Sequence, residues 1–238
     1  MGEDRAQSGS GRSTEADRAY ARLREAIVGE RLAPNERLIE VELAEELGVG
    51  RAAVRTALAR LEQDGLVDRV AYRGARVRAI SEAEAVEIVE ARAVLEGLVA
   101  RHAARRATGE DVARLRATLR DMQARLEAGD LLGLSGLNGQ LHRQMLGIAR
   151  HETATRHIDA LQAQNARYQF RTVLVPGRAA ESLAEHRAII AAVEAGQSDE
   201  AETLMLRHLS HVVEALRQAA KGRDGAWTAP ESTAILPA

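Results

Sequence analysis

The sequence predicts a mainly α protein, in which an N-terminal winged helix-turn-helix is followed by a C-terminal all-helical bundle of about six helices. Two observations carry this prediction. Between residues 38 and 79, two short amphipathic segments flank a glycine turn and precede an alternating strand pattern. From residue 81 to 221, a helical period continues with only short breaks. Hydrophobic residues make up 45% of the chain and aromatic ones 2%, which predicts a core of Leu, Ala, Val and Ile.

The first predicted domain covers residues 13–80. Residues 1–12 are polar and rich in Gly and Ser, and we interpret them as a disordered tail. Ser13 or Thr14 can cap a helix that runs to about Gly29, because a side-chain hydroxyl accepts from the backbone N–H groups of the first turn. We expect this helix to pack on the two that follow and to complete a three-helix core.

A short helix is predicted over residues 40–47, with Leu43 and Leu47 on one face. Gly48 follows at its end, where glycine enters the left-handed conformation at little cost. A second helix is predicted from about Arg51 to Gln63. Two helices joined by a tight glycine turn indicate a helix-turn-helix, whose second helix can enter the DNA major groove.

The outer face of the second helix carries Arg51 and Arg55, four residues apart. Arginine pairs bidentately with guanine, so these two residues are candidates for reading base edges. Two short strands are then predicted over residues 66–70 and 75–79, joined by a hairpin tip that contains Arg73 and Gly74. Such a hairpin completes a winged helix, and an arginine at its tip suits a minor groove or a phosphate.

The second predicted domain covers residues 81–221, and residues 222–238 have no period and are interpreted as a loose tail. Breaks at glycine, proline and polar residues divide the domain into short-looped, antiparallel helices. The six predicted helices span about 82–106, 109–128, 130–149, 152–174, 177–195 and 198–220.

Charge and composition narrow the class of protein. The net charge of −2 is unusual for a nucleic-acid binder, but residues 51–78 hold seven arginines, a local basic footprint for phosphate. The chain has no cysteine, so any metal site must use His, Asp, Glu or Asn. No apolar run reaches the roughly 20 residues of a membrane helix, and the N-terminus does not resemble a signal peptide. We therefore expect a cytoplasmic protein without a membrane partner.

Three of the seven histidines, His142, His186 and His208, fall in the middle of three different predicted helices. Imidazoles that converge from separate helices are a common way for bundles to bind metal ions. The alternative is that they are unrelated helix histidines, some exposed and some hydrogen-bonded in the core. Periodicity alone leaves both possibilities open.

Short motifs recur along the first domain at fixed spacing: Arg37-Leu38, Glu42-Leu43-Ala44, Leu47-Gly48-Val49, Arg51, Val54-Arg55, Ala57-Leu58, Arg60-Leu61, Gly65-Leu66-Val67 and Arg73-Gly74. In this spacing they resemble the GntR family of bacterial transcription regulators. The resemblance implies DNA contacts by Arg37, Arg51, Arg55, Arg73 and Gly74. The chain departs from the family pattern in four places: Gly50 replaces Ser or Thr, Ala52-Ala53 replaces a Thr/Ser-Pro pair, Asn35 replaces Gly, and Val41 replaces an arginine.

The second domain holds Arg92 with Glu96, Asn138 with His142, Glu185-His186 and Met205-x-x-His208. These pairs resemble the FCD effector-binding domain of the FadR branch of GntR regulators. The resemblance implies a divalent metal, zinc or nickel, held by Asn138, His142, His186 and His208. It also implies a small carboxylate effector, for which Arg92 is the candidate partner. The family usually has Asp where this chain has Asn138, and the neutral amide is the weaker ligand.

We therefore expect a transcription regulator, more often a repressor in this family, which acts as a homodimer on an inverted-repeat operator in double-stranded DNA and senses a small organic acid. It is not expected to be an enzyme. Two alternatives are a metal-dependent enzyme built on the helical bundle and an architectural DNA-binding protein without an effector.

Overall fold

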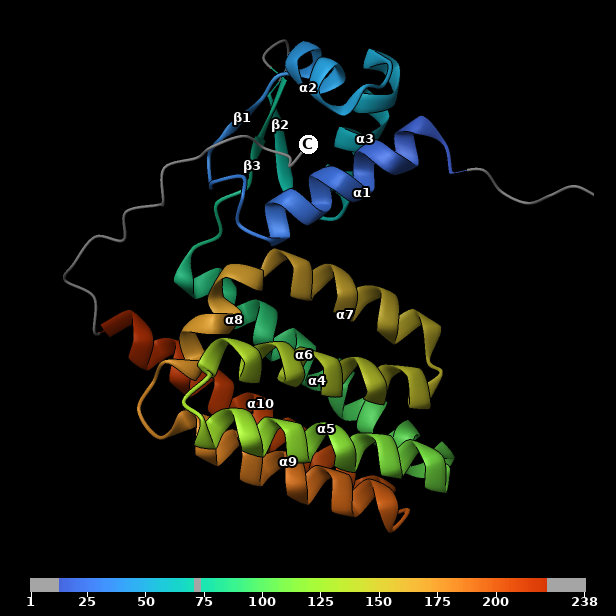
Figure 1. Ribbon diagram of the computed structural model, residues 1–238, viewed down its shortest axis with the longest axis vertical. Helices are drawn as coiled ribbons and strands as arrows, with labels where there is room; N and C mark the ends of the chain where they lie inside the picture. Colours follow the sequence, from blue (N-terminus) through green and yellow to red (C-terminus); the bar gives the residue numbers. More distant parts are fainter. Residues whose placement is uncertain (1–12, 71–73, 222–238) are drawn as a thin grey trace, which may run out of the picture. The chain divides into compact units, whose positions relative to one another are not determined.

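The computed structural model describes residues 13–70 and 74–221, which form two units (Figure 1). The first unit ends at Ala79 and the second begins at Ile80. The predictions for both terminal tails and for Arg73 concern residues outside the described part of the chain. No described helix is long and apolar enough to cross a lipid bilayer.

The first unit contains three helices and a three-stranded antiparallel sheet. The helices are α1 (Glu15–Val28), α2 (Glu40–Leu47) and α3 (Arg51–Gln63), and the strands are β1 (Arg37–Leu38), β2 (Val67–Val70) and β3 (Gly74–Val77). Thr14 caps α1 in a capping box with Asp17, as the hydroxyl there predicts. The buried faces of the three helices form one core, which includes Leu23, Leu43 and Leu58. The winged helix-turn-helix prediction is confirmed.

The sheet differs from the prediction in two details. Its order is β1-β3-β2, and β1 was not predicted, because a two-residue strand leaves no periodic signal in the sequence. Leu38 pairs with Ala75 across β1 and β3. Gly74, which we expected in the hairpin loop, begins β3 instead. Its φ of +83° and the Leu38 carbonyl oxygen 2.8 Å from where a Cβ would lie both require glycine.

Asn35 explains one departure from the family pattern. Its φ is +65°, a left-handed conformation that glycine adopts most readily and asparagine tolerates better than most residues. Its backbone N–H donates to the carbonyl of Val77 at 2.8 Å, which fixes the loop before β1 against the sheet. Asparagine therefore replaces glycine here without changing the fold.

The described part of the second unit, residues 80–221, consists of seven helices: α4 (Glu82–Arg106), α5 (Gly109–Glu127), α6 (Leu131–Ala149), α7 (Glu152–Gln164), α8 (Ala166–Val173), α9 (Arg178–Glu194) and α10 (Ser198–Lys221). The long helix α4 is central and packs against α6, α7, α9 and α10. Figure 1 shows α5 beside α9, an arrangement that their contacts confirm. A continuous apolar core, with Leu115, Leu141 and Ile189 among its fully buried members, joins these helices.

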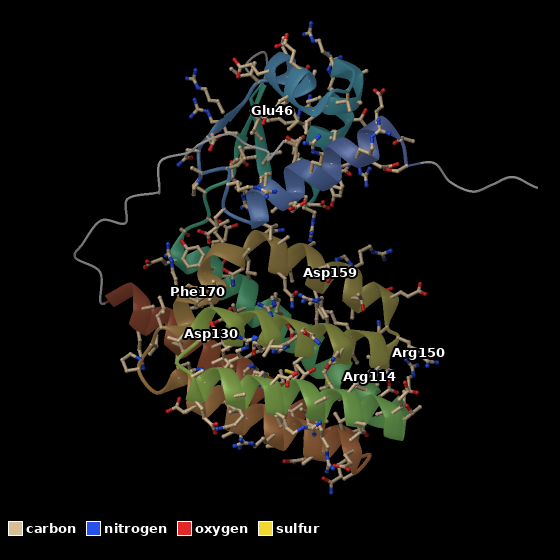
Figure 2. The ribbon with its side chains drawn as sticks, in the orientation of Figure 1. Glu46, Arg114, Asp130, Arg150, Asp159 and Phe170 are labelled. Atoms are coloured by element: carbon tan, nitrogen blue, oxygen red, sulfur yellow. The ribbon has the colours of Figure 1, made fainter. Side chains whose placement is uncertain are left out.

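The prediction of one helix over residues 152–174 was wrong. Asn165 ends α7 and precedes α8, with φ −96° and ψ 7°, so the bundle has seven helices instead of six. Asparagine is a weak helix former, since its side chain competes for backbone hydrogen bonds. The short helix α8 contacts α6, α9 and α10, and Phe170 on it is labelled in Figure 2.

Candidate functional site

The first candidate site is the outer surface of α3. Arg51 and Arg55 are both exposed there, as their spacing predicts. Arg51 forms no ion pair within the described part of the chain, whereas an Arg55 Nη lies 3.3 Å from a carboxylate oxygen of Glu40 on α2. Arg37 is exposed on β1, at the edge of the sheet. The first unit thus presents three exposed arginines, of which Arg55 is paired with a carboxylate.

The N-terminus of α3 lacks the side-chain hydroxyl cap that the family pattern usually supplies. Gly50 is the N-cap residue and makes no side-chain hydrogen bond. Its backbone N–H donates instead to a carboxylate oxygen of Glu15 on α1 at 3.0 Å. Because this contact links residues 35 positions apart, it ties the recognition helix to α1. A contact of this kind has no local sequence signal.

The second candidate site is a cluster of three histidines in the core of the second unit. His142 comes from α6, His186 from α9 and His208 from α10. Their exposed fractions are 4%, 0% and 2%. One nitrogen from each ring lies within 4.8 Å of the others, so the three could share one metal ion. Asn138, the fourth residue implied by the family resemblance, lines the cavity beside them.

Two carboxylates orient these rings. The Nδ1 of His142 donates to Glu96 Oε2 at 2.6 Å, and the Nδ1 of His208 donates to Glu185 Oε2 at 2.6 Å. When Nδ1 holds the proton, Nε2 of the same neutral ring keeps a free lone pair. Metal-binding histidines commonly donate their other N–H to a carboxylate in this way. This arrangement leaves the Nε2 atoms of His142 and His208 with lone pairs that can bind a cation.

His186 supplies the third nitrogen of the histidine cluster. The Nε2 of His186 lies 3.3 Å from the Nε2 of His142. Two nitrogens that each lie about 2.0–2.1 Å from a tetrahedral zinc ion are separated by about 3.3 Å. The Nδ1 of His186 is buried and has no hydrogen-bond partner among the described residues. The spacing and chemistry of these nitrogens therefore suit a divalent metal ion.

The electrostatics of the cluster favour neutral rings at His186 and His208 and a charged carboxylate at Glu185. Burial lowers the pKa of His208 to about 4, although the hydrogen bond to Glu185 opposes it, and burial lowers the pKa of His186 as well. Burial alone would raise the pKa of Glu185, but hydrogen bonds from His208, His211 and Arg178 outweigh it and lower that pKa to about 2. At neutral pH the nitrogens of His186 and His208 are therefore free of competing protons.

Arg92 directs two of its three guanidinium nitrogens to Glu96. It is buried on α4, where its Nε and Nη2 donate to Glu96 Oε1 at 2.9 and 2.6 Å. Glu96 in turn accepts from His142, so the three residues form a continuous buried chain. Arg92 lines the cavity but is also committed to this chain. Arg92 and Glu96 thus form an i, i+4 ion pair inside the core.

A cavity of about 60 Å³ lies next to the cluster. Besides Asn138, His142 and His208, it is lined by Arg178 at the start of α9 and by Asn165 between α7 and α8. Neither Arg178 nor Asn165 was selected from the sequence, and Glu185 was noted only as the neighbour of His186. Arg178 lies in a helix whose pattern gives it no special status. Only the tertiary fold brings these residues together.

The other histidines lie outside the cluster. His211 donates to Glu185 Oε1 at 2.6 Å and its side chain is 40% exposed, so it is peripheral. The rings of His102 and His151 are 5.2 Å apart between centroids. The Nδ1 of His151 accepts from the backbone N–H of Ala154 and caps α7. These histidines serve the scaffold.

Comparison with known proteins decides the family. The model of bacterial regulatory proteins of the gntR family matches residues 15–77, and the FCD domain model matches residues 87–211. The chain belongs to the GntR family. An HTH-type transcriptional regulator of Agrobacterium vitis is 35% identical over 134 residues, which are 55% of this chain and 78% of that protein. The HTH-type transcriptional repressor RspR of Escherichia coli K12 is 29% identical over 199 residues, 84% of this chain and 87% of RspR.

Solved structures of GntR regulators share the fold. E. coli McbR/YncC superposes with a TM-score of 0.70 at 21% identity, covering 86% of this chain and 98% of that one. A GntR regulator from Rhodococcus sp. RHA1 gives a TM-score of 0.64 at 23% identity, covering 87% and 98%. The family match and the named relatives identify this GntR chain as a DNA-binding transcription regulator. The families and relatives are regulators rather than enzymes, which confirms the prediction that it is not an enzyme.

Proposed function

We propose that this GntR regulator senses a small carboxylate at a metal ion in its FCD domain and thereby changes its affinity for an operator. The observation that carries the proposal is the convergence of three buried imidazoles, two of them oriented by carboxylates, beside a cavity with polar walls. A purely structural core has little reason to bury three imidazoles together with their carboxylate partners.

His142, His186 and His208 would hold the metal through their Nε2 atoms, and Asn138 would add a neutral carbonyl oxygen. Imidazole ligands suit zinc and nickel. When bound, the dication supplies a positive charge and an open coordination position, both of which attract a carboxylate. The chain's own residues supply the remaining contacts from the cavity wall.

On DNA, we propose that two copies form a homodimer and that each winged helix reads one half of an inverted repeat. Arg51 and Arg55 would contact base edges, with Arg37 and the wing residues Arg73 and Gly74 beside them. The exposure of Arg37, Arg51 and Arg55 supports this assignment. Repression is the proposed outcome, as in the relative named a repressor.

The test measures metal content and operator binding on the same preparations. A binding sequence is first selected from random double-stranded DNA with the full chain. Purified wild type should then contain about one zinc or nickel ion per chain by elemental analysis, and light scattering should give a dimer on the selected DNA. His142→Ala should lose the metal and the response of DNA binding to small acids. Metal-free wild type after refolding with zinc and nickel would overturn the metal-linked part of the proposal.

A further inference from the structure

Two buried polar atoms in the cavity wall lack partners. The Nη1 of Arg178 and the Oδ1 of Asn165 are inaccessible to solvent and form no hydrogen bond within the described part of the chain. Both residues line the cavity beside the histidine cluster. Their whole side chains are nearly buried, with exposed fractions of 5% for Arg178 and 2% for Asn165. Native proteins rarely leave such groups unpaired, so each unpaired atom points to a missing partner.

Arg178 has one half of its guanidinium anchored, while the other half has no partner among the described residues. Its Nη2 donates to Glu185 Oε2 at 2.8 Å and lies 3.5 Å from the Nδ1 of His208. This anchoring fixes the orientation of the planar group beside the metal ligands. Arg92, by contrast, directs both Nε and Nη2 to Glu96. Among the described residues of the cavity wall, Arg178 thus offers a buried donor without a partner, and its charge selects an anionic acceptor.

Asn165 has an unpaired acceptor, whereas Arg178 has an unpaired donor. Its free Oδ1 is an acceptor, so its missing partner must be a donor. An unsubstituted carboxylate accepts hydrogen bonds but does not donate them, and cannot satisfy Asn165 and Arg178 together. A hydroxyl group on the same small molecule can. A ligand that carries both a carboxylate and a hydroxyl would therefore supply partners for Arg178 Nη1 and Asn165 Oδ1.

The size of the cavity restricts that ligand. A volume of about 60 Å³ accommodates only about four to six water molecules, at about 10–15 Å³ for each. A ligand of this size has only a few non-hydrogen atoms.

We propose that Arg178 and Asn165 determine specificity in this pocket, Arg178 donating from Nη1 to the carboxylate of a short hydroxy acid and Asn165 accepting from its hydroxyl. This inference rests on the proposed function, because it assigns residues to the effector of that same site. It replaces Arg92 as the residue that holds the carboxylate, and gives Arg92 the role of positioning Glu96.

The test uses three matched probes and the zinc-loaded full chain. Glycolate carries both groups, acetate lacks the hydroxyl, and glycolamide lacks the charge. Isothermal titration calorimetry should show wild type binding glycolate more tightly than acetate, and acetate more tightly than glycolamide. Arg178→Gln should weaken both acids by roughly tenfold or more, because a charge-assisted hydrogen bond is lost. Asn165→Leu, which keeps the side-chain volume, should abolish the preference for glycolate over acetate.

Controls separate this inference from the function on which it rests. Circular dichroism should stay at the wild-type value in both variants, and zinc content is measured on every sample so that acid affinities are compared only between zinc-loaded proteins. If Arg178→Gln does not fold, Arg178→Lys, which keeps the charge facing Glu185 but lacks the second donor arm, should show the same loss. Equal binding of acids by wild type and by these Arg178 variants would overturn the inference and leave the proposed function intact. Failure of wild type to bind either acid would overturn the inference together with the effector part of the proposed function.

Discussion

The imidazole of His142 and the carboxylate of Glu96 lie 2.6 Å apart inside the core, although 46 residues separate them in the sequence. Arg92 binds the other oxygen of the same carboxylate. Burial alone would raise the pKa of Glu96, but the neighbouring Arg92 charge and His142 outweigh it and hold that pKa well below its usual range. The carboxylate is therefore charged at neutral pH, and it fixes the His142 ring with Nε2 facing the other two histidines.

Glu96→Gln should weaken metal binding. The neutral amide holds the imidazole less firmly, and loss of an orienting carboxylate typically costs 10- to 100-fold in metal affinity, or roughly 1.4–2.7 kcal/mol. Zinc affinity is measured by competition with a chelating dye. Glu90→Gln, an exposed change on the same helix, is the control and should bind zinc as wild type does. Equal zinc affinity in both variants would remove the orienting role of Glu96.

Metal-free protein should lose stability as the pH falls from about 6.5 to 4. The folded-state pKa of His208 is about 4, below its ordinary 6.5, so the unfolded chain binds the proton first. Each pH unit in this window costs about 1.4 kcal/mol, or roughly 3 kcal/mol in total for this group. His186 acts in the same direction. Glu185, with a pKa of about 2 against 4.5, adds a further loss below about pH 4.5.

Urea unfolding of chelator-stripped protein at several pH values measures this dependence. His208→Gln should reduce the slope between pH 6.5 and 4, whatever its effect on absolute stability. His157→Gln, which changes an exposed histidine, should leave the slope as it is. A slope in His208→Gln as steep as in wild type would show that His208 does not carry the effect.

The winged helix was predictable because its signals are local. The apolar spacing of Leu43 and Leu47, the left-handed Gly48 and the exposed pair Arg51 and Arg55 all lie within one short stretch. Helical periods and glycine turns report directly on such elements. The two-residue strand β1 escaped prediction because it exists only through its pairing with β3.

The candidate site was only partly predictable. Family resemblance selected His142, His186 and His208, and the fold brings them together. The anchoring of Arg178 by Glu185, and the break at Asn165 that places its side chain in the cavity wall, depend on tertiary contacts between helices. Residues of this kind carry no periodic signal, since charged and amide side chains are common on exposed helix faces. Pocket specificity therefore required the structure.

Asn138→Asp should strengthen metal binding. A carboxylate supplies a negative charge that offsets the dication, whereas the amide supplies only a dipole, and the family usually has Asp at this position. We expect zinc affinity to rise by roughly tenfold, about 1.4 kcal/mol. The dye competition assay measures it, with Asn138→Ala as the variant expected to fall below wild type. If the aspartate variant binds zinc no better, residue 138 is not a ligand.

Arg51→Ala should reduce specific operator binding. Loss of a bidentate contact to a base costs about 1–3 kcal/mol and relaxes preference at one base pair. Fluorescence anisotropy on the selected sequence and on single-base variants measures both effects. Arg114→Ala, on α5 of the second unit and labelled in Figure 2, is the control for loss of one positive charge. A uniform loss across all sequences would assign Arg51 to phosphate instead of a base.

Tyr168→Phe should uncouple the effector from DNA. The Tyr168 hydroxyl donates to the carbonyl of Ile80 at 2.9 Å, and the same side chain lines the cavity. Ile80 is the first residue of the second unit and follows Ala79, the last of the first. A ligand that repositions α8 would therefore act on the segment that leads to the DNA-binding unit, and such coupling is typically worth 1–3 kcal/mol.

The measured quantity is the ratio of operator affinities with and without the bound acid, because a ratio cancels any general loss of DNA binding. We expect Tyr168→Phe to bring it toward one, while the acid's own affinity changes little. Tyr20→Phe removes a comparable hydroxyl hydrogen bond, to Asp64 in the first unit, and should preserve the ratio. If the ratio in Tyr168→Phe equals that of wild type, the effector must reach the DNA-binding unit through another contact, since this variant leaves Ile80 without its hydroxyl donor.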